Sequence, residues 1–335
     1  MAKGPSTQVH IEDSMLKEMY WTMLLARRLD ERAWVLHRQG KIAFHVSGIG
    51  QEAAQVGAAF ALRRGQDWLV PYYRDLAMML AFGLSPRDYA LSLMGKKGEP
   101  SSGARQLPNH WSLRRANVVS HSSPVATQTP HAAGIGLAIK LRGDDSVVMT
   151  CIGEGSTSQG EWYEGVNWAA IHKLPVIFFI ENNEYAISVH QAKQMAVTNA
   201  AEKAAGLGLP GFSVDGLNVI EVYERVKEAA DRARQREGPT LIEARVLRMT
   251  PHSSDDDDRS YRPRQEIDAM KERDPLQSFR DLLIQNRVLD ESEEEAFQLK
   301  AKEQVEDAVQ FAESQPYPDI IDAAFPVYAE DVRNV

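Results

Sequence analysis

The sequence predicts an α/β fold in which helices flank a parallel sheet. Apolar runs at residues 147–152 and 174–180 have the length and the β-branched or aromatic content of buried strands. A helical pattern at 158–173 lies between them. Strand, helix and strand at this spacing form a βαβ unit, which requires a parallel pair. The two strands therefore end at one edge of the sheet, where open α/β sheets bind ligands.

The other elements follow from periodicity and from helix start and stop residues. Asp13 or Ser14 can cap the first helix, and residues 158–161 have capping-box spacing. Residues 95–123 form a long Gly/Ser/basic loop, and loops of this length inside compact domains are usually functional. Helices are expected at 13–40, 52–62, from Ser85, 131–141, 219–236, 274–286 and 293–314, and strands at 68–71 and 240–248.

These elements indicate one domain over residues 13–335, preceded by a disordered lead at 1–12. We divide it into a helical arm (13–40), an α/β core (41–262) and a helical tail (263–335).

Charge and cysteine content narrow the function classes. The 38 basic and 47 acidic residues give a net charge of −9, which argues against a nucleic-acid surface. The one cysteine, Cys151, allows no internal disulfide and fits a reducing compartment. The start of the sequence lacks a signal-peptide apolar region, and no apolar run reaches membrane-spanning length. We therefore expect a cytoplasmic protein without nucleic-acid or membrane partners.

Oxygen-bearing side chains follow both strands of the βαβ unit. Glu154 stands in Gly-Glu-Gly (153–155) after the first strand, and Asn183 ends Glu-Asn-Asn (181–183) after the second. A carboxylate, an amide oxygen and turn carbonyls suit Mg²⁺, which takes further ligands from phosphates. The glycines permit a tight turn and a close approach to a diphosphate. The alternative is a plain βα turn with an asparagine pair at a strand end.

Three other segments carry candidate chemistry. Tyr73 and Arg74 follow a strand and can clamp a phosphate, although from these residues alone a surface salt bridge is the better explanation. Hydroxyls, an amide and carbonyls at 122–128 can surround a monovalent cation, contact a cofactor or cap a helix. His252 has an ordinary pKa near working pH and can carry protons, or it is a loop histidine without a role. The aspartates at 255–258 are expected to be solvated and mobile.

Together these stretches resemble the alpha subunit of the decarboxylating component of 2-oxo acid dehydrogenase complexes, of the branched-chain type. The resemblance covers nearly the whole chain and implies a thiamine diphosphate-binding fold. Gly-Glu-Gly in place of the more general Gly-Asp-Gly favours the branched-chain type over pyruvate. The matching motifs are GQEA at 50–53, PYYRD at 71–75, ARQLPNH at 104–110, SSPVATQ at 122–128, GEGSTSQGE at 153–161, ENNEYAIS at 181–188 and PHSSDDDDRSYR at 251–262.

The resemblance assigns roles to residues at matching positions. Mg²⁺ would be held by Glu154, Asn183 and the Tyr185 carbonyl. A potassium site would consist of Ser122, Pro124, Thr127 and Gln128. His252 would be catalytic, and Arg259, Tyr261 and Arg262 would order its loop. Ser253 matches a serine that is phosphorylated in some branched-chain relatives. Nothing in the sequence indicates a kinase, so no such regulation is predicted. The thiamine diphosphate contacts would be Tyr73, Arg74, Ser123, Val125, Glu154, Gly155, Ser156, Gln159, Asn183 and Ile187.

The implied reaction is oxidative decarboxylation of branched-chain 2-oxo acids such as 2-oxoisovalerate, with acyl transfer to the lipoyl group of a dihydrolipoyl acyltransferase. The resemblance also implies an α₂β₂ assembly, in which the cofactor lies between alpha and beta subunits and beta supplies the activating carboxylate. Alternatives are a pyruvate or acetoin dehydrogenase alpha subunit, a non-catalytic partner-binding subunit, and a metal-dependent phosphohydrolase built on Glu154 and residues 255–258.

Overall fold

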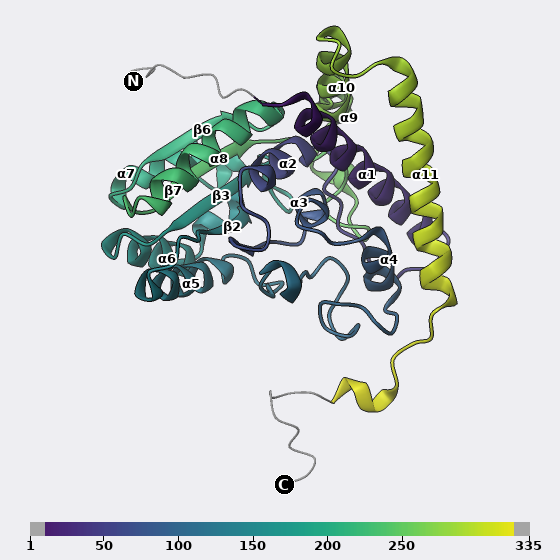
Figure 1. Ribbon diagram of the computed structural model, residues 1–335, viewed down its shortest axis with the longest axis horizontal. Helices are drawn as coiled ribbons and strands as arrows, with labels where there is room; N and C mark the ends of the chain where they lie inside the picture. Colours follow the sequence, from purple (N-terminus) through teal and green to yellow (C-terminus); the bar gives the residue numbers. More distant parts are fainter. Residues whose placement is uncertain (1–10, 325–335) are drawn as a thin grey trace.

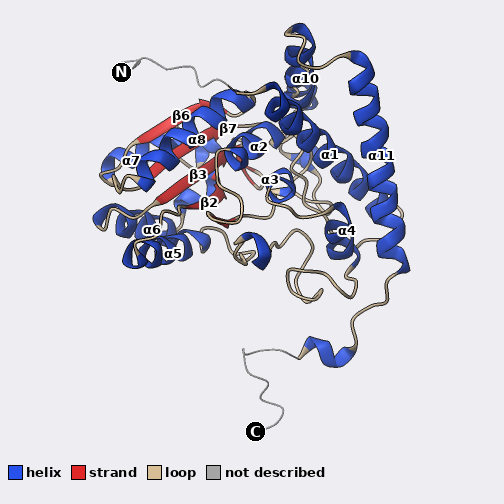
Figure 2. Cartoon of the chain, in the orientation of Figure 1, coloured by secondary structure: helices blue, strands red, loops and turns tan. Residues whose placement is uncertain are grey.

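A parallel sheet lies at the centre of the molecule (Figures 1 and 2). The computed structural model describes residues 11–324. The strand order is β1-β2-β3-β7-β6, and every neighbouring pair is parallel. The predicted α/β class is therefore confirmed. The strands are β1 (Trp68–Val70), β2 (Val148–Gly153), β3 (Val176–Asn182), β7 (Thr240–Arg245) and β6 (Gly211–Asp215).

Helices cover both faces of the sheet (Figure 1). On one face lies α8 (Val219–Arg234), with α2 (Glu52–Phe60) packed against it. On the other lie α5 (Gln128–Arg142) and α6 (Gly160–Ile171). Neighbouring strand residues point to opposite faces, so Phe179 joins the first core and Phe178 the second. Burial on both faces explains why these strands read as continuous apolar runs.

The predicted βαβ unit is present as β2, α6 and β3. Gly153 pairs with Glu181 in the parallel register, so the two strands end side by side. The expected capping box at 158–161 is wrong. A 3-10 helix, η2 (Glu154–Ser158), occupies the first part of this stretch, and α6 begins at Gly160 without a side-chain cap. Thr157 instead donates its hydroxyl proton to the Glu154 carbonyl at 2.7 Å, which supports the 3-10 turn.

The helical arm and tail pack on each other beside the core (Figure 1). The arm is α1 (Asp13–Arg38), and its cap position is Glu12 rather than Asp13 or Ser14, with no side-chain cap bond. The tail contains α9 (Arg264–Lys271), α10 (Pro275–Gln285) and α11 (Glu291–Ser314). Between arm and core lies α3 (Leu76–Ala81), whereas α4 (Pro86–Met94) packs against the tail helix α11 and has the predicted capping box at Ser85.

Two further elements differ from the sequence prediction. β6 was not predicted as a strand, because its few residues are mostly solvent-accessible on the sheet edge and lack an apolar run. The strand predicted at 240–248 ends at Arg245, where pairing with β3 and β6 stops. In the lead at 1–12, residues 1–10 lie outside the described residues. None of the described helices is long and apolar enough to cross a membrane.

Candidate active site

A cavity of about 400 Å³ opens at the carboxyl ends of β1, β2 and β3. Every residue predicted to contact the cofactor lines it, as do Tyr185 and His252. Parallel strands explain this convergence, because their carboxyl ends share one edge. The cavity wall also contains residues to which the sequence assigned no role, among them Phe44, Val46, Tyr72, Leu107, His110 and Ala186.

Glu154 and Asn183 meet at this edge as predicted. The Asn183 backbone N–H donates to Glu154 Oε2 at 3.3 Å, while Glu154 Oε1 is buried without a hydrogen-bond partner. Burial raises the pKa of Glu154 to about 7. The side-chain oxygen of Asn183 accepts from the Tyr185 N–H at 3.3 Å. A buried carboxylate oxygen without a partner, beside an amide oxygen, is a donor set that fits Mg²⁺.

Two backbone features bring η2 and the turn after β3 together. A Cβ at Gly155 would lie 2.8 Å from the Ala186 Cβ, so a side chain larger than hydrogen would force the two segments apart. Ile187 adopts a φ of 56°, which is rare for a β-branched residue, yet its side chain lines the cavity. Strain of this kind concentrates at functional sites.

Arg74 connects the cavity wall to His252. Its guanidinium donates to the Ser47 carbonyl at 2.8 Å, to the His252 carbonyl at 2.9 Å and to His252 Nδ1 at 3.0 Å. Arginine can only donate, so Nδ1 is an acceptor and the neutral ring carries its proton on Nε2. Burial, Arg74 and Arg248 together lower the pKa of His252 to about 3. The expectation of a pKa near working pH is therefore wrong for this state of the protein.

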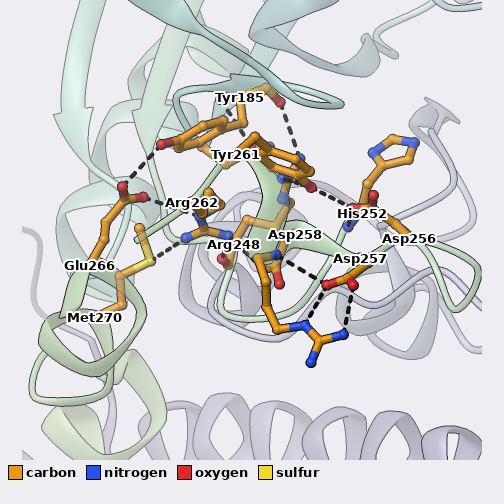
Figure 3. Close-up of polar contacts among 12 residues, drawn as sticks. Tyr185, Arg248, His252, Asp256, Asp257, Asp258, Tyr261, Arg262, Glu266 and Met270 are labelled. Carbon is orange, nitrogen blue, oxygen red and sulfur yellow. Dashed lines mark hydrogen bonds and ion pairs between the residues drawn. The ribbon is translucent and has the colours of Figure 1, made fainter. Parts of the chain in front are cut away.

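Polar contacts, most of them partly buried, hold the loop that carries His252 (Figure 3). Asp256 accepts from the His252 N–H at 2.8 Å and from the Tyr261 hydroxyl. Arg248 donates to the Tyr261 hydroxyl at 3.0 Å, and Arg262 donates to the Arg248 carbonyl at 2.7 Å. The loop is thereby attached to the segment after β7.

The acidic run at 255–258 is therefore not simply a solvated, mobile segment. Asp256 bonds within the loop, and Asp258 is buried beside Arg262. Arg259 forms an exposed ion pair with Asp257 instead of contacting the buried part of the loop.

Comparison with known proteins decides the family. A family model described as dehydrogenase E1 component matches residues 20–321. This chain belongs to the dehydrogenase E1 component family. It is 48% identical over 320 residues to the 2-oxoisovalerate dehydrogenase subunit alpha of Bacillus subtilis, covering 96% of this chain and 97% of that protein. The resemblance stated from the sequence is thus confirmed.

Other E1 relatives are more distant. The Pyruvate dehydrogenase E1 component subunit alpha of Staphylococcus aureus is 37% identical over 97% of this chain and 85% of its own length. The 3-methyl-2-oxobutanoate dehydrogenase subunit alpha of Mycobacterium tuberculosis is 36% identical over 96% of this chain and 84% of its own length. Membership of the E1 family makes the chain part of an oxidoreductase and implies thiamine diphosphate as the cofactor.

In this E1 chain His110 lines the cavity, a role that the sequence reasoning missed, and His121 packs against it. His110 Nε2 lies 2.5 Å from the Ser123 hydroxyl, and its Nδ1 lies 3.1 Å from the Leu107 carbonyl. Nδ1 therefore carries the proton of the neutral ring, and Nε2 accepts from Ser123. His121 stacks on His110 with ring centres 5.2 Å apart, and burial lowers the pKa of His121 to about 4. The length of the 95–123 loop was the available signal.

The E1 chain also brings the four predicted potassium ligands together behind Ser123. The Ser122 hydroxyl lies 2.6 Å from the Thr127 hydroxyl and 3.2 Å from the Pro124 carbonyl. The Thr127 hydroxyl lies 3.1 Å from that carbonyl and 3.5 Å from Gln128 Oε1. Hard oxygen atoms gathered in this way suit a cation. The Ser122 and Thr127 hydroxyls can also satisfy each other by hydrogen bonding when no cation is bound.

Proposed function

We propose that this chain is the alpha subunit of a thiamine diphosphate-dependent component that oxidatively decarboxylates branched-chain 2-oxo acids such as 2-oxoisovalerate. The acyl group is passed to the lipoyl group of a dihydrolipoyl acyltransferase. The observation that carries the proposal is the single cavity in which Glu154, Asn183, Arg74 and His252 converge. The 48% identity to a 2-oxoisovalerate dehydrogenase subunit alpha supports the substrate class.

The cavity residues divide the work by their chemistry. Glu154, Asn183 and the Tyr185 carbonyl hold Mg²⁺, which neutralises the diphosphate. Bound thiamine diphosphate supplies the electron sink for decarboxylation, a task that side chains perform poorly. Arg74 adds positive charge at the diphosphate end while it orients His252. The remaining predicted contacts line the diphosphate end (Tyr73, Gly155, Ser156 and Gln159) and the body of the cofactor (Ser123, Val125 and Ile187).

His252 presents its Nε2–H as a hydrogen-bond donor. Because Arg74 occupies Nδ1, the ring keeps one orientation and one tautomer. We assign to His252 the donation of a hydrogen bond from Nε2 to the group that takes up negative charge during acyl transfer. A potassium ion at Ser122, Pro124, Thr127 and Gln128 would stiffen the segment that carries Ser123 and Val125.

Turnover of competing 2-oxo acids tests the substrate class. The chain is co-expressed with its beta subunit and supplied with thiamine diphosphate and Mg²⁺. Decarboxylation of 2-oxoisovalerate is measured beside decarboxylation of pyruvate, and cleavage of acetoin, which has no carboxyl group, is measured separately. We expect a strong preference for 2-oxoisovalerate. A preference for pyruvate, which the 37% identical relative makes the second candidate, would overturn the substrate class and keep the chemistry. No turnover by a formed complex would favour a non-catalytic subunit.

Assembly gives a separate prediction. An α₂β₂ component that docks on a lipoyl acyltransferase core requires beta to complete the cofactor site. We therefore expect the isolated chain to show no turnover and the co-expressed pair to appear as a tetramer in native mass spectrometry. Activity of the isolated chain would contradict this assembly. A cytoplasmic location stays a prediction.

A further inference from the structure

Glu243 on β7 is a buried carboxylate that the site described above does not use. Its side chain is fully buried and accepts three hydrogen bonds. The donors are Asn182 Nδ2 at 2.6 Å and the backbone N–H groups of Ala200 and Ala201 at 2.9 and 3.1 Å. Burying a carboxylate is costly unless hydrogen-bond donors replace its hydration. The Glu243 carboxylate therefore holds its three donor groups in place.

Asn182 links this carboxylate to the turn that carries the proposed metal ligands. Its Nδ2 donates to Glu243 and also to Gln191 Oε1 at 2.7 Å, so both of its protons are used. Its Oδ1 accepts from the Glu184 N–H at 2.9 Å. Glu184 has a φ of 66°, a left-handed conformation that needs support from outside the turn. Asn182 therefore shapes the turn, and Asn183 presents its side chain to the cavity.

Residues 191–203, which we name the brace segment, also contact η2, the element that carries the other proposed metal ligand, Glu154. Gln194 Nε2 donates to the Glu154 carbonyl at 3.3 Å and to the Ser158 hydroxyl at 3.0 Å. Lys203 donates to the Thr157 hydroxyl at 2.7 Å and to the Thr157 carbonyl at 3.0 Å. One segment is thus tied both to η2 and, through Glu243 and Asn182, to the end of β3.

We propose that Glu243 and Asn182 are positioning residues that set the separation of Glu154 and Asn183 before a cation binds. The inference rests on the proposed function, because the cation is the Mg²⁺ proposed there. Mg²⁺ demands nearly ideal octahedral geometry, so small displacements of its ligands weaken binding. Groups that orient metal ligands in this way typically change metal affinity by about 10- to 100-fold when they are removed.

An exchange of the two side-chain types tests the contact. Asn182→Asp places a second carboxylate beside that of Glu243, and Glu243→Gln removes the negative charge that accepts from Asn182. The double variant restores one carboxylate and one amide with their positions exchanged. In the complex with beta, we expect each single change to raise the Mg²⁺ concentration for half-maximal thiamine diphosphate binding by about 10-fold or more. The double variant should recover part of this loss, because the contact between residues 182 and 243 is restored while the bond to Gln191 is not.

Three quantities are measured for each variant. Tryptophan fluorescence during Mg²⁺ titration gives the Mg²⁺ midpoint, and kcat at saturating Mg²⁺ and the melting temperature without Mg²⁺ are measured beside it. We expect kcat at saturation to stay within about twofold of the unaltered complex, because the ligands themselves remain. The control is Glu228→Gln, the same change in an exposed ion pair with Arg225 on α8, which should leave the Mg²⁺ midpoint unchanged. Lys203→Met breaks the second tie of the brace segment and provides a test if Asn182→Asp does not fold.

The outcomes separate the two proposals. Mg²⁺ midpoints that stay unchanged in folded variants would overturn the positioning role. A fall in both melting temperature and kcat without a shift in the Mg²⁺ midpoint would also overturn it. So would a Mg²⁺ midpoint in the double variant that is raised by the product of the two single-variant effects. Absence of Mg²⁺-dependent cofactor binding in the unaltered complex would instead contradict the proposed function.

Discussion

His252 and Arg74 meet although 178 residues separate them in the chain. The contact assigns the tautomer of His252 and, together with burial and Arg248, keeps the ring neutral. A neutral ring with Nε2–H facing a cavity donates a hydrogen bond and cannot accept a proton at that atom. This favours a role for His252 as a hydrogen-bond donor at Nε2 over a role as a general base at that atom.

We expect His252→Ala to lower the rate of acyl transfer to a lipoyl domain by about 100-fold or more, because removing one preorganised hydrogen-bond donor at a developing charge costs about 10²–10³-fold. Thiamine diphosphate affinity should change little, since Mg²⁺ and its ligands remain. The check is single-turnover acylation of a lipoyl domain beside cofactor titration. Unimpaired acylation by the variant would remove His252 from the mechanism.

Glu154 predicts how metal binding depends on pH. Its pKa in the folded chain is raised from 4.5 to about 7, so the folded state without metal binds a proton more tightly than the unfolded state. The stability from this group is fully present below about pH 4.5 and is lost as pH rises through about 7. Mg²⁺ binds the ionised carboxylate, so added Mg²⁺ should raise the melting temperature more at pH 8 than at pH 6. This difference should vanish in Glu154→Gln; an equal Mg²⁺ effect at both pH values in the unaltered protein would contradict the assignment.

At the scale of elements, the loop after β7 is held by side chains rather than by regular backbone pairing. Asp256, Tyr261 and Arg248 form a chain of hydrogen bonds that ends at the His252 backbone (Figure 3). A loop with few backbone bonds depends on such contacts, so removing one should affect its order before it affects global stability.

Tyr261→Phe should therefore loosen this loop. The change deletes the donor to Asp256 and the acceptor for Arg248, and each lost hydrogen bond should cost about 0.5–1.5 kcal/mol because these contacts are only partly buried. We expect faster hydrogen exchange over residues 252–261 and slower lipoyl acylation. Arg259→Gln is the matched control, because its ion pair with Asp257 is exposed and should contribute little. Equal exchange rates in the two variants would refute this account of loop order.

At the scale of the whole molecule, Arg27 joins arm, core and tail. From α1 its Nε donates to Glu52 at the start of α2 at 2.6 Å, and its two terminal nitrogens donate to Asp274, which caps α10, at 2.7 and 2.9 Å. Glu52 is buried and also accepts from the Gly50 N–H. Where arm, core and tail meet, the Arg27 guanidinium is therefore neutralised by the Glu52 and Asp274 carboxylates.

Arg27→Met should lower the free energy of unfolding by about 3–5 kcal/mol, because it leaves the buried Glu52 carboxylate without its cation. Glu31→Gln, which removes the exposed pair with Arg28 on the same helix, should cost less than about 1 kcal/mol. Urea unfolding of the two variants measures the difference. Similar midpoints would mean that Arg27 does not connect the three parts energetically.

Much of the fold and most of the candidate site could be predicted from the sequence. Apolar runs around Cys151 and Phe178 indicated buried strands, and their spacing required a parallel pair. The parallel pair in turn predicted that Glu154 and Asn183 share one edge. These inferences hold because strand period, strand length and connection length are local properties of the chain. Motif resemblance added Tyr73, Arg74 and His252 to the same cavity.

The partners of those residues were decided by tertiary structure alone. The neutral state of His252, its bond to Arg74, the role of His110 and the anchoring of Asn182 by Glu243 all depend on segments brought together by packing. β6 was missed for the same reason, since an edge strand is defined by its neighbour β7 and not by its own apolar pattern. Burial and hydrogen-bond partners set pKa and orientation, and local sequence carries no record of either.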